Sequence, residues 1–269
     1  MIGFGLPKRR LGCTDAYVTP LGLGGAWLGR TPDGLDESVG IATVRRALEL
    51  GVNLIDTSAA YLRRESERFI GLALEEWYGR GGKREELVLT TKTGTHVRPH
   101  DYSAAATRES VSRSLELLKT DYLDVVLIHD PQDLTQALSP GGALEVLQEY
   151  KAQGIIRAIG LGVRTHKFHR QCIEAGLIDV SLTFRDYHLL GQSAEDGVLA
   201  VAAAHGVGVL NGSPTLNGLL GGGDPLEFVR EVEKTGQRWM RIEDDRVQHV
   251  RALWGFGQAH DVSLLALNL

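Results

Sequence analysis

Short runs of apolar, β-branched-rich residues alternate with longer amphipathic segments along the chain. This alternation predicts repeated strand–helix units around a parallel sheet, because parallel neighbouring strands need a crossover between them. The predicted strands are Leu21–Gly25, Val52–Asp56, Leu87–Lys92, Leu123–His129, Ala158–Gly162, Val180–Phe184 and Val207–Leu210. The predicted helices are Ile41–Leu50, Ser66–Trp77, Ala104–Leu118, Ala143–Gln153, Phe168–Ala175 and Ala194–His205.

Four glycines punctuate this pattern, each after a predicted helix and just before a strand: Gly51, Gly154, Gly176 and Gly206. Glycine at this place favours a left-handed helix C-terminus, so each marks a return from helix to strand. No low-complexity linker or shift in composition interrupts the 269 residues. We therefore expect residues 1–269 to form a single domain, as barrels of this length do.

The strand count favours an α/β fold of the TIM (β/α)8-barrel type, with seven strands recognisable and the eighth missing. After the seventh strand the chain runs through Gly218–Gly223 and then through helical segments to Leu269. A seven-stranded barrel has two unpaired edges, which natural folds avoid. An open, doubly wound sheet is the alternative, but Gly22–Gly25 in the first turn does not fit the dinucleotide-binding G-x-G-x-x-G motif.

Composition excludes several classes of partner. The net charge of −5 argues against a nucleic-acid partner, because phosphate binding needs a concentrated basic face. No apolar run reaches the roughly 18 residues of a membrane span, and because the first seven residues lack the charged start and apolar core of a signal peptide, none is expected there. Two distant cysteines, Cys13 and Cys172, suit a reducing cytoplasm, and the scattered histidines show no metal-binding spacing.

Residues whose side chains can take part in catalysis lie where three consecutive predicted strands end. Asp56 ends the second strand, with Tyr61 in the loop after it; Lys92 ends the third, and His129 the fourth. In a parallel barrel these ends share one mouth, where active sites lie. Each residue alone also has a structural interpretation, such as a helix cap for Asp56. Together they favour a catalytic group.

The chemistry of the four residues is mutually consistent. Asp56 is the natural partner for a buried Lys92, and the Lys92 ammonium is expected to lower the pKa of the Tyr61 phenol, which is about 10 in water. His129 is expected to bind and orient the substrate oxygen. The set resembles a proton relay for carbonyl chemistry that needs no metal.

The same residues carry a resemblance to the aldo-keto reductase family. The matching stretches are Asn53–Tyr61, Ser66–Leu74, Thr91–Gly94 and Tyr122–His129, and the similarity runs nearly end to end. The resemblance implies that Tyr61 is the general acid and base, that Lys92 and Asp56 tune it, and that His129 orients the substrate. It also implies NADP or NAD as the cofactor and a small-molecule carbonyl or sugar as the substrate.

A narrower likeness points to the galactose- and fucose-type aldose 1-dehydrogenase branch. It rests on Pro140–Leu144, Ile159–Arg164, Asp186–Leu190 and Asn211–Pro214. The resemblance places the cofactor against Gly25, Gly162, Val163, Asn211, Gly212, Ser213 and Pro214, and the substrate against Trp27 and Arg63. Gly162-Val163 stands where many members have Ser-Asn, and Gly212 where many have an aromatic residue. The last strand and the loop for the adenosine phosphate are not found in the chain, so self-association at an open barrel seam is also expected.

Three functional hypotheses remain open from the sequence. The first is an NAD(P)-dependent oxidoreductase acting on a small aldose, aldehyde or ketone. The second is a barrel with weakened cofactor binding that acts as a binding or regulatory protein. The third is a Schiff-base aldolase using Lys92, which the neighbouring Asp56 disfavours because imine formation requires a neutral amine.

Overall fold

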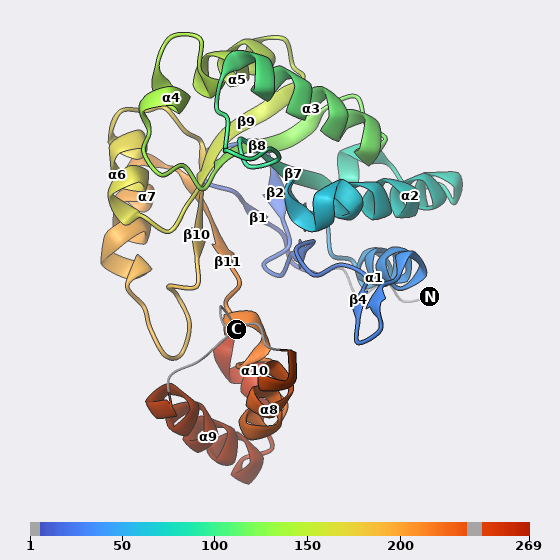
Figure 1. Cartoon of the computed structure of the whole chain (residues 1–269), viewed down its shortest axis with the longest axis vertical. Coiled ribbons are helices and arrows are strands. Elements are labelled where there is room, and N and C mark those ends of the chain that lie inside the picture. Colours follow the sequence, from blue (N-terminus) through green and yellow to red (C-terminus); the bar gives the residue numbers. More distant parts are fainter. Residues whose placement is uncertain (1–5, 236–243) are drawn as a thin grey trace.

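The computed structural model describes residues 6–235 and 244–269 and has a parallel, nearly closed barrel at its centre (Figure 1). Its sheet has the order β11-β10-β9-β8-β7-β6-β3, and every neighbouring pair is parallel. The strands are β3 (Leu23–Gly24), β6 (Leu54–Asp56), β7 (Val88–Thr93), β8 (Leu123–His129), β9 (Ile156–Gly162), β10 (Val180–Phe184) and β11 (Gly208–Gly212). The predicted barrel is confirmed, and the open doubly wound alternative is wrong.

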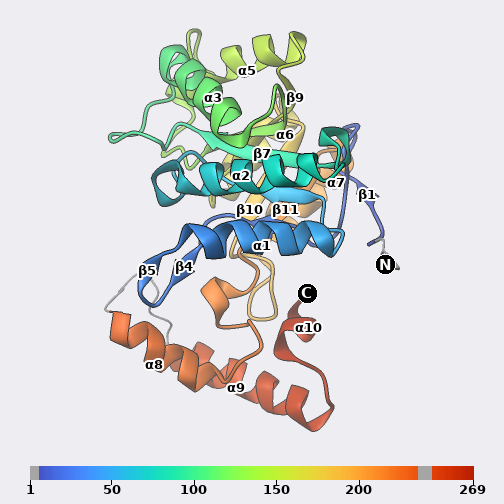
Figure 2. The ribbon, with the colours of Figure 1, turned by 90° about the vertical axis from the view of Figure 1, so that its right-hand side faces the viewer.

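Helices follow the strands and cover the outside of the sheet, with α1 and α2 side by side (Figure 2). The helices along the sheet are α1 (Glu37–Glu49), α2 (Glu65–Gly79), α3 (Ala104–Leu118), α4 (Thr135–Leu138), α5 (Ala143–Ala152), α6 (His166–Glu174) and α7 (Ala200–His205). The remaining helical elements are the π-helical η3 (Glu195–Leu199), the 3₁₀ turns η1 (Tyr61–Arg64), η2 (Arg84–Glu86) and η4 (Leu216–Gly218), and the helices α8 (Pro225–Thr235), α9 (Asp244–Ala259) and α10 (Leu264–Asn268).

Most predicted boundaries agree with the structure to within a few residues, with two clear corrections. The first barrel strand shrinks to Leu23–Gly24, and Leu21 is exposed before it. The first helix starts earlier than predicted, at Glu37, because the Asp36 side chain accepts hydrogen bonds from two backbone N–H groups of the first turn. The four predicted helix-ending glycines all have positive φ angles, as expected.

Two layers of apolar side chains hold the barrel. The interior layer gathers alternate strand residues such as Leu54, Val88, Val125 and Val180. The outer layer packs the other faces of the strands against the helices, with Phe69 among its fully buried members. This two-sided burial explains why the strands appear in the sequence as continuous apolar runs.

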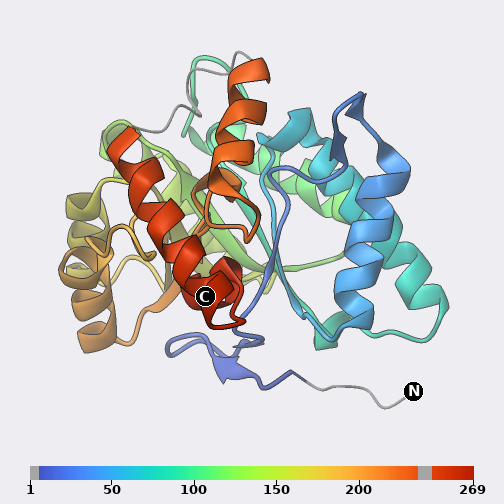
Figure 3. The same cartoon turned by 90° about the horizontal axis from the view of Figure 1, so that it is seen from below.

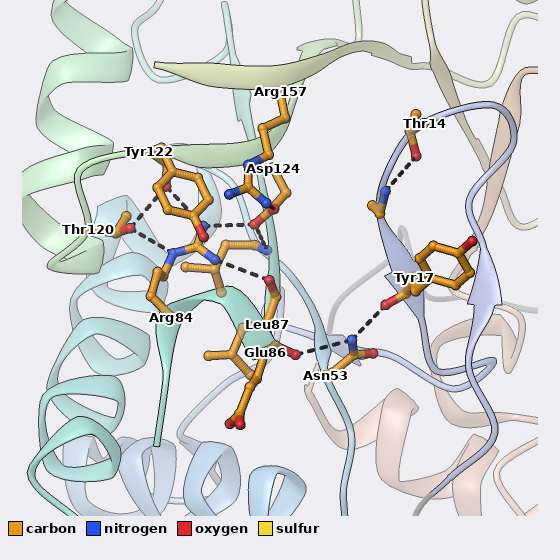
Figure 4. Close-up of polar contacts among 12 residues, drawn as sticks. Thr14, Tyr17, Asn53, Arg84, Glu86, Leu87, Thr120, Tyr122, Asp124 and Arg157 are labelled. Atoms are coloured by element: carbon orange, nitrogen blue, oxygen red, sulfur yellow. Dashed lines mark hydrogen bonds and ion pairs between the residues drawn. The ribbon is translucent and has the colours of Figure 1, made fainter. Parts of the chain in front are cut away.

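An N-terminal hairpin, β1 (Arg9–Arg10) and β2 (Tyr17–Val18), closes the base of the barrel, and sequence patterns did not predict it. The backbone N–H of Cys13 in its turn donates to Gly206 O (2.7 Å), just before β11. At the second strand of the hairpin, Tyr17 O accepts a hydrogen bond from Nδ2 of Asn53, which precedes β6 (2.8 Å; Figure 4). The hairpin therefore connects the two sides of the open sheet. A second small hairpin pairs β4 (Arg30–Thr31) with β5 (Gly34–Leu35).

The same base carries a buried ion-pair cluster around Asp124 (Figure 4). Its carboxylate contacts Arg84 (2.7 Å) and Arg157 (3.3 Å) and accepts from Leu89 N (2.9 Å). Both guanidinium groups lie over the ring of Tyr122: the Cζ atoms of Arg84 and Arg157 are 3.9 and 4.0 Å from the ring centroid. Polar side chains at this end are thus satisfied by each other, as expected of the stabilising face of a barrel.

The C-terminal helices α8, α9 and α10 gather beyond the end of β11, on the side that faces the viewer in Figure 3. They share a small core of their own that includes Leu216, Leu220, Val250 and Leu264. Among the residues described, no helix is long and apolar enough to cross a membrane.

Candidate active site

Parallel strand register brings the four predicted residues to one end of the barrel. Asp56 is the last residue of β6 and His129 the last of β8, and Lys92 lies between them near the end of β7. In the ladder, Asp56 is level with Thr90, while Lys92 is level with Leu127. Tyr61 follows β6 at the start of η1.

Lys92 and Asp56 form the buried base of this group. The Lys92 Nζ donates to both carboxylate oxygens of Asp56 (2.8 and 2.7 Å) and to Thr57 O (2.6 Å). Thr90 donates a further hydrogen bond to Asp56 Oδ1 (2.6 Å). Lys92 is only 1% exposed. All three protons of the ammonium thus have acceptors, which a buried charge requires.

This environment keeps Lys92 protonated. Burial lowers the pKa of Lys92, but the negative charge of Asp56 and the interaction with Tyr61 raise it by more, so the pKa of Lys92 lies above its usual value. The Nζ lies 4.8 Å from the centre of the Tyr61 ring. A permanent positive charge therefore stands beside the phenol.

Tyr61 departs from the expected direction. Burial raises the pKa of Tyr61, and although the charge of Lys92 lowers it, the charges of Asp56 and Asp130 add to the rise. The predicted influence of Lys92 has the right sign, but the expectation of a lowered pKa is wrong, because desolvation penalises the phenolate more strongly. The raised pKa keeps Tyr61 a neutral phenol at neutral pH.

His129 is held as a neutral imidazole. Burial lowers the pKa of His129 well below its usual value, and the nearby charges of Lys92, His100 and Arg98 lower it further. Its Nδ1 contacts the hydroxyls of Thr95 (2.7 Å) and Ser58 (3.1 Å).

The imidazole also meets the phenol edge-on. The His129 ring stands at 82° to the Tyr61 ring, with centroids 5.9 Å apart. Tyr102 donates to the backbone O of His129 (2.7 Å). The sequence analysis missed Ser58, Thr95 and Tyr102, since a hydroxyl near a strand end carries no signal of its own.

A second missed feature is the buried network that supports the Tyr61 loop. Glu67, with no exposed surface, pairs with Arg64 (3.2 Å) and accepts from Thr91 (2.7 Å). The backbone of Leu62, Arg63 and Arg64 is left-handed, with φ angles of 52°, 56° and 72°. The buried ion pair holds this unusual turn directly after Tyr61.

The glycines and valine expected at the cofactor differ in what surrounds them. Gly25 packs against the backbone and hydroxyls at the start of the Tyr61 loop, where a Cβ would lie 2.4 Å from Ser66 Oγ. Gly162 has only ordinary contacts around such a Cβ. Val163 is buried among the outer-layer residues, so its side chain does not face the barrel mouth. A Cβ on Gly212 would lie 3.0 Å from Leu182 and from the backbone of β10.

The loop after β11 contacts the C-terminal helix. Asn211 is exposed and donates from Nδ2 to Tyr187 O (2.9 Å). Ser213 has a left-handed φ of 51°, and Pro214 O accepts from Asn268 in α10 (3.1 Å). This part of the predicted cofactor site is therefore shaped by tertiary contacts with a distant segment.

Two basic side chains lie in the loops that follow β9 and β10. Arg164 lies two residues after β9, and Arg185 directly after β10. Burial lowers the pKa of Arg185, and the charges of Arg164 and Arg246 lower it further. Among the residues described, neither guanidinium has an ion pair or hydrogen bond; Arg164 is exposed, whereas Arg185 is half-buried, and a half-buried cation is suited to an anion.

The residues expected at the substrate lie outside the buried group. Trp27 is 40% exposed, and Arg30 lies over its ring at 4.9 Å. Arg63 is exposed at the left-handed turn after Tyr61. Within the described ranges, His, Cys, Asp and Glu side chains nowhere form a group of three or more suited to a metal ion.

The site can now be compared with known proteins. The family model described as "Aldo/keto reductase family" matches residues 20–265. An L-galactose dehydrogenase of Arabidopsis thaliana is 33% identical over 227 residues, which cover 82% of this chain and 69% of that protein. A D-threo-aldose 1-dehydrogenase of a Pseudomonas species is 25% identical, covering 84% of this chain and 76% of that protein.

A solved structure of an aldo-keto reductase also resembles this chain. The holo form of an aldo-keto reductase from Bacillus halodurans superimposes with a TM-score of 0.67 and 28% identity, covering 96% of this chain and 84% of that chain. The matched region includes every strand of the barrel and all four clustered residues. The chain belongs to the aldo/keto reductase family.

Proposed function

We propose that this chain is an NAD(P)-dependent oxidoreductase that transfers a hydride between a nicotinamide cofactor and a small aldose, aldehyde or ketone. One observation carries the proposal: a buried phenol, a buried ion-paired ammonium and a neutral imidazole converge at one end of the barrel. These groups are what proton transfer at a carbonyl oxygen requires. In this proposal Tyr61 is the general acid and base.

Each residue has a distinct task. When bound, the nicotinamide supplies or accepts the hydride. His129 donates a hydrogen bond from Nε2 to the substrate oxygen, and Tyr61 gives that oxygen its proton during reduction. The raised pKa of Tyr61 suits a donor that begins as a phenol. Lys92, fixed by Asp56, stabilises the phenolate that the transfer leaves behind.

Oxidation at C1 of an aldose is the direction that the related dehydrogenases suggest. The sugar would lose a hydride from C1 to the oxidised nicotinamide and the proton of its C1 hydroxyl to the Tyr61 phenolate, which yields a lactone. Arg164 and Arg185 would hold the cofactor phosphates, with Gly162, Gly212 and the loop at Ser213 beside them. We also propose a cytoplasmic location, with Cys13 and Cys172 both free thiols.

The test combines cofactor binding with turnover. Fluorescence titration with NADH and with NADPH measures affinity, and absorbance assays with aldoses and aldehydes measure hydride transfer. Tyr61→Phe keeps the ring packing and removes the proton, so turnover is expected to fall by roughly 10² to 10⁴. Cofactor affinity should stay within about twofold, since Tyr61 lies in the loop after β6 whereas Arg164 and Arg185 follow β9 and β10.

Two other results would replace the proposal. A fully active Tyr61→Phe variant would show that another group transfers the proton. Cofactor binding without turnover of any carbonyl or sugar would favour a binding or regulatory protein. Borohydride trapping addresses an aldolase: covalent labelling of Lys92 would require a neutral amine, which its raised pKa opposes.

A further inference from the structure

The residue after His129 has a carboxylate that the fold does not use. Asp130 directly follows β8 with a left-handed φ of 45°, and its N–H donates to Gly162 O (2.8 Å). Its side chain remains 58% exposed, and among the residues described no hydrogen-bond donor contacts the carboxylate. His129 Nε2 lies 3.7 Å from Asp130 Oδ2. This separation is too long for a direct hydrogen bond.

The hydrogen bonds of His129 indicate which ring nitrogen carries the proton. Ser58 Oγ already accepts from the N–H of Ala60 (3.2 Å), so its hydroxyl proton is available for His129 Nδ1. Thr95 also has a hydroxyl proton within reach of Nδ1 (2.7 Å). Both hydroxyls can donate to Nδ1, and for the proposal below we take Nδ1 as the acceptor and Nε2 as the nitrogen that carries the proton of the neutral ring. A donor at Nε2 and an acceptor at Asp130 Oδ2 thus stand side by side.

This pair matches two oxygens on adjacent carbons. A carbonyl oxygen accepts a hydrogen bond and a neighbouring hydroxyl donates one, and these two oxygens lie roughly one hydrogen-bond length apart, ~2.8 Å. We propose that the Asp130 carboxylate binds the hydroxyl group on the carbon next to the reacting carbon. The site then prefers aldoses and α-hydroxy carbonyl compounds over simple carbonyls. This inference rests on the proposed function, because it takes His129 Nε2 as the ligand of the reacting oxygen.

The position of Asp130 supports this role in two further ways. Its negative charge contributes to the raised pKa of Tyr61, so the carboxylate lies close enough to the phenol to face the same substrate. The left-handed backbone also favours Asp, Asn or Gly over other residues. The distance of 3.7 Å between Asp130 Oδ2 and His129 Nε2 places the carboxylate beside the imidazole at the end of β8.

The test uses substrate pairs that differ only in the adjacent hydroxyl. Lactaldehyde and propanal form the pair for reduction, and galactose and 2-deoxygalactose form the pair for oxidation. Asp130→Gly removes the carboxylate and tolerates the left-handed backbone. It should lower kcat/KM for lactaldehyde and galactose by about 10- to 100-fold, as expected for a lost hydrogen bond to a charged group. The values for propanal and 2-deoxygalactose should change less than about twofold.

Two further variants serve as a conservative substitution and as a control. Asp130→Asn retains an acceptor oxygen and the backbone preference, so it should show a smaller loss on the same hydroxylated substrates. It also carries the test if the glycine variant does not fold. Asp133→Asn changes an exposed carboxylate in the same loop, one that accepts a hydrogen bond from Thr135 N, and should leave both pairs unchanged. Comparing variant with wild type for each substrate cancels the intrinsic reactivity of that substrate.

The possible outcomes are distinct. An equal loss on both members of a pair would overturn the proposal, because Asp130 would then act through His129 rather than on the hydroxyl. Unchanged values for every substrate would also overturn it. If the wild-type chain reduces or oxidises none of these compounds with either cofactor, the proposed function fails, and this inference fails with it.

Discussion

At the scale of single residues, the backbone directly after Tyr61 is strained. The three residues after it, Leu62–Arg64, adopt left-handed conformations that cost roughly 1 kcal/mol each or more for side chains other than glycine. The buried Glu67 pairs with Arg64 and accepts from Thr91, which stabilises the turn. Backbone strain concentrated beside Tyr61 is typical of a site whose geometry is fixed before a substrate binds.

The Lys92 charge gives a pH prediction. Lys92 lowers the pKa of Tyr61, so Lys92→Met should raise that pKa further. Alcohol oxidation requires the phenolate, and its rising pH limb should therefore move to higher pH, by about one unit or more, with a loss of rate at neutral pH. The measurement is kcat for oxidation across pH 7 to about 11. An unmoved limb would contradict a role for Lys92 in tuning Tyr61.

Asp56→Asn provides a control of opposite sign. The Asp56 charge raises the pKa of Tyr61, so its removal should move the same limb to lower pH. The variant should also lose stability, by roughly 3–5 kcal/mol, because it leaves the buried Lys92 ammonium without its counter-charge. Thermal melting measures this loss beside the pH profile. A limb that shifts upward in both variants would point to general damage rather than to charge.

At the scale of elements, the N-terminal hairpin is the device that closes the base. Its turn lies against the start of β11, and its return passes Asn53 before β6. Leu11 and Val18 add their side chains to the barrel interior. One short hairpin thus connects the two sides of a sheet whose edge strands do not pair with each other.

Gly12 in the hairpin turn offers a stability test. It has a φ of +59°, and a Cβ would lie 2.3 Å from Gly208 N and 2.5 Å from Gly206 O. Gly12→Ala should therefore displace the hairpin and lower stability by roughly 2–4 kcal/mol, read from the melting temperature. Gly154→Ala is the matched control, since its φ is +75° but the space around it is open, and it should cost only ~1 kcal/mol. Equal losses would mean that backbone conformation, rather than close packing, decides both.

At the scale of the whole molecule, the described part of the barrel has two edges. β3 and β11 each have a neighbour on one side only, as the strand count predicted. Gly208 N donates to Asp179 O and Gly212 O accepts from Arg185 N, so these β11 residues face β10. The alternation of a parallel ladder then directs the backbone of Val209 to the open side. Exposed strand edges of this kind pair with other chains.

We expect concentration-dependent self-association through this edge, measured by sedimentation from micromolar to about tenfold higher concentrations. Val209→Pro removes an edge N–H without removing a bond to β10 and should weaken the association. Val209→Ala is the control: it also shortens the side chain but retains the backbone N–H, so it should associate like the wild type. A wild-type chain that stays monomeric throughout this range would contradict the expectation.

Much of the site was predictable because it depends on period and order in the sequence. Asp56, Lys92 and His129 stand at the ends of successive apolar strands, and parallel strands place such ends together whatever the packing details. The apolar runs likewise predicted the seven strands of the barrel, since burial on both faces gives a strand a continuous apolar sequence. Tyr61 was predictable because it lies in the loop directly after the second strand, at the same end of the barrel.

Only the tertiary structure decided the balance of charges and the long-range contacts. Whether burial or Lys92 prevails at Tyr61 depends on how much water the folded site excludes, which residue types do not reveal. The hydroxyls at His129, the Glu67 network and the free carboxylate of Asp130 became visible only once distant segments met. Sequence patterns report the faces that each element buries, whereas solvation and pairing are properties of the assembled whole.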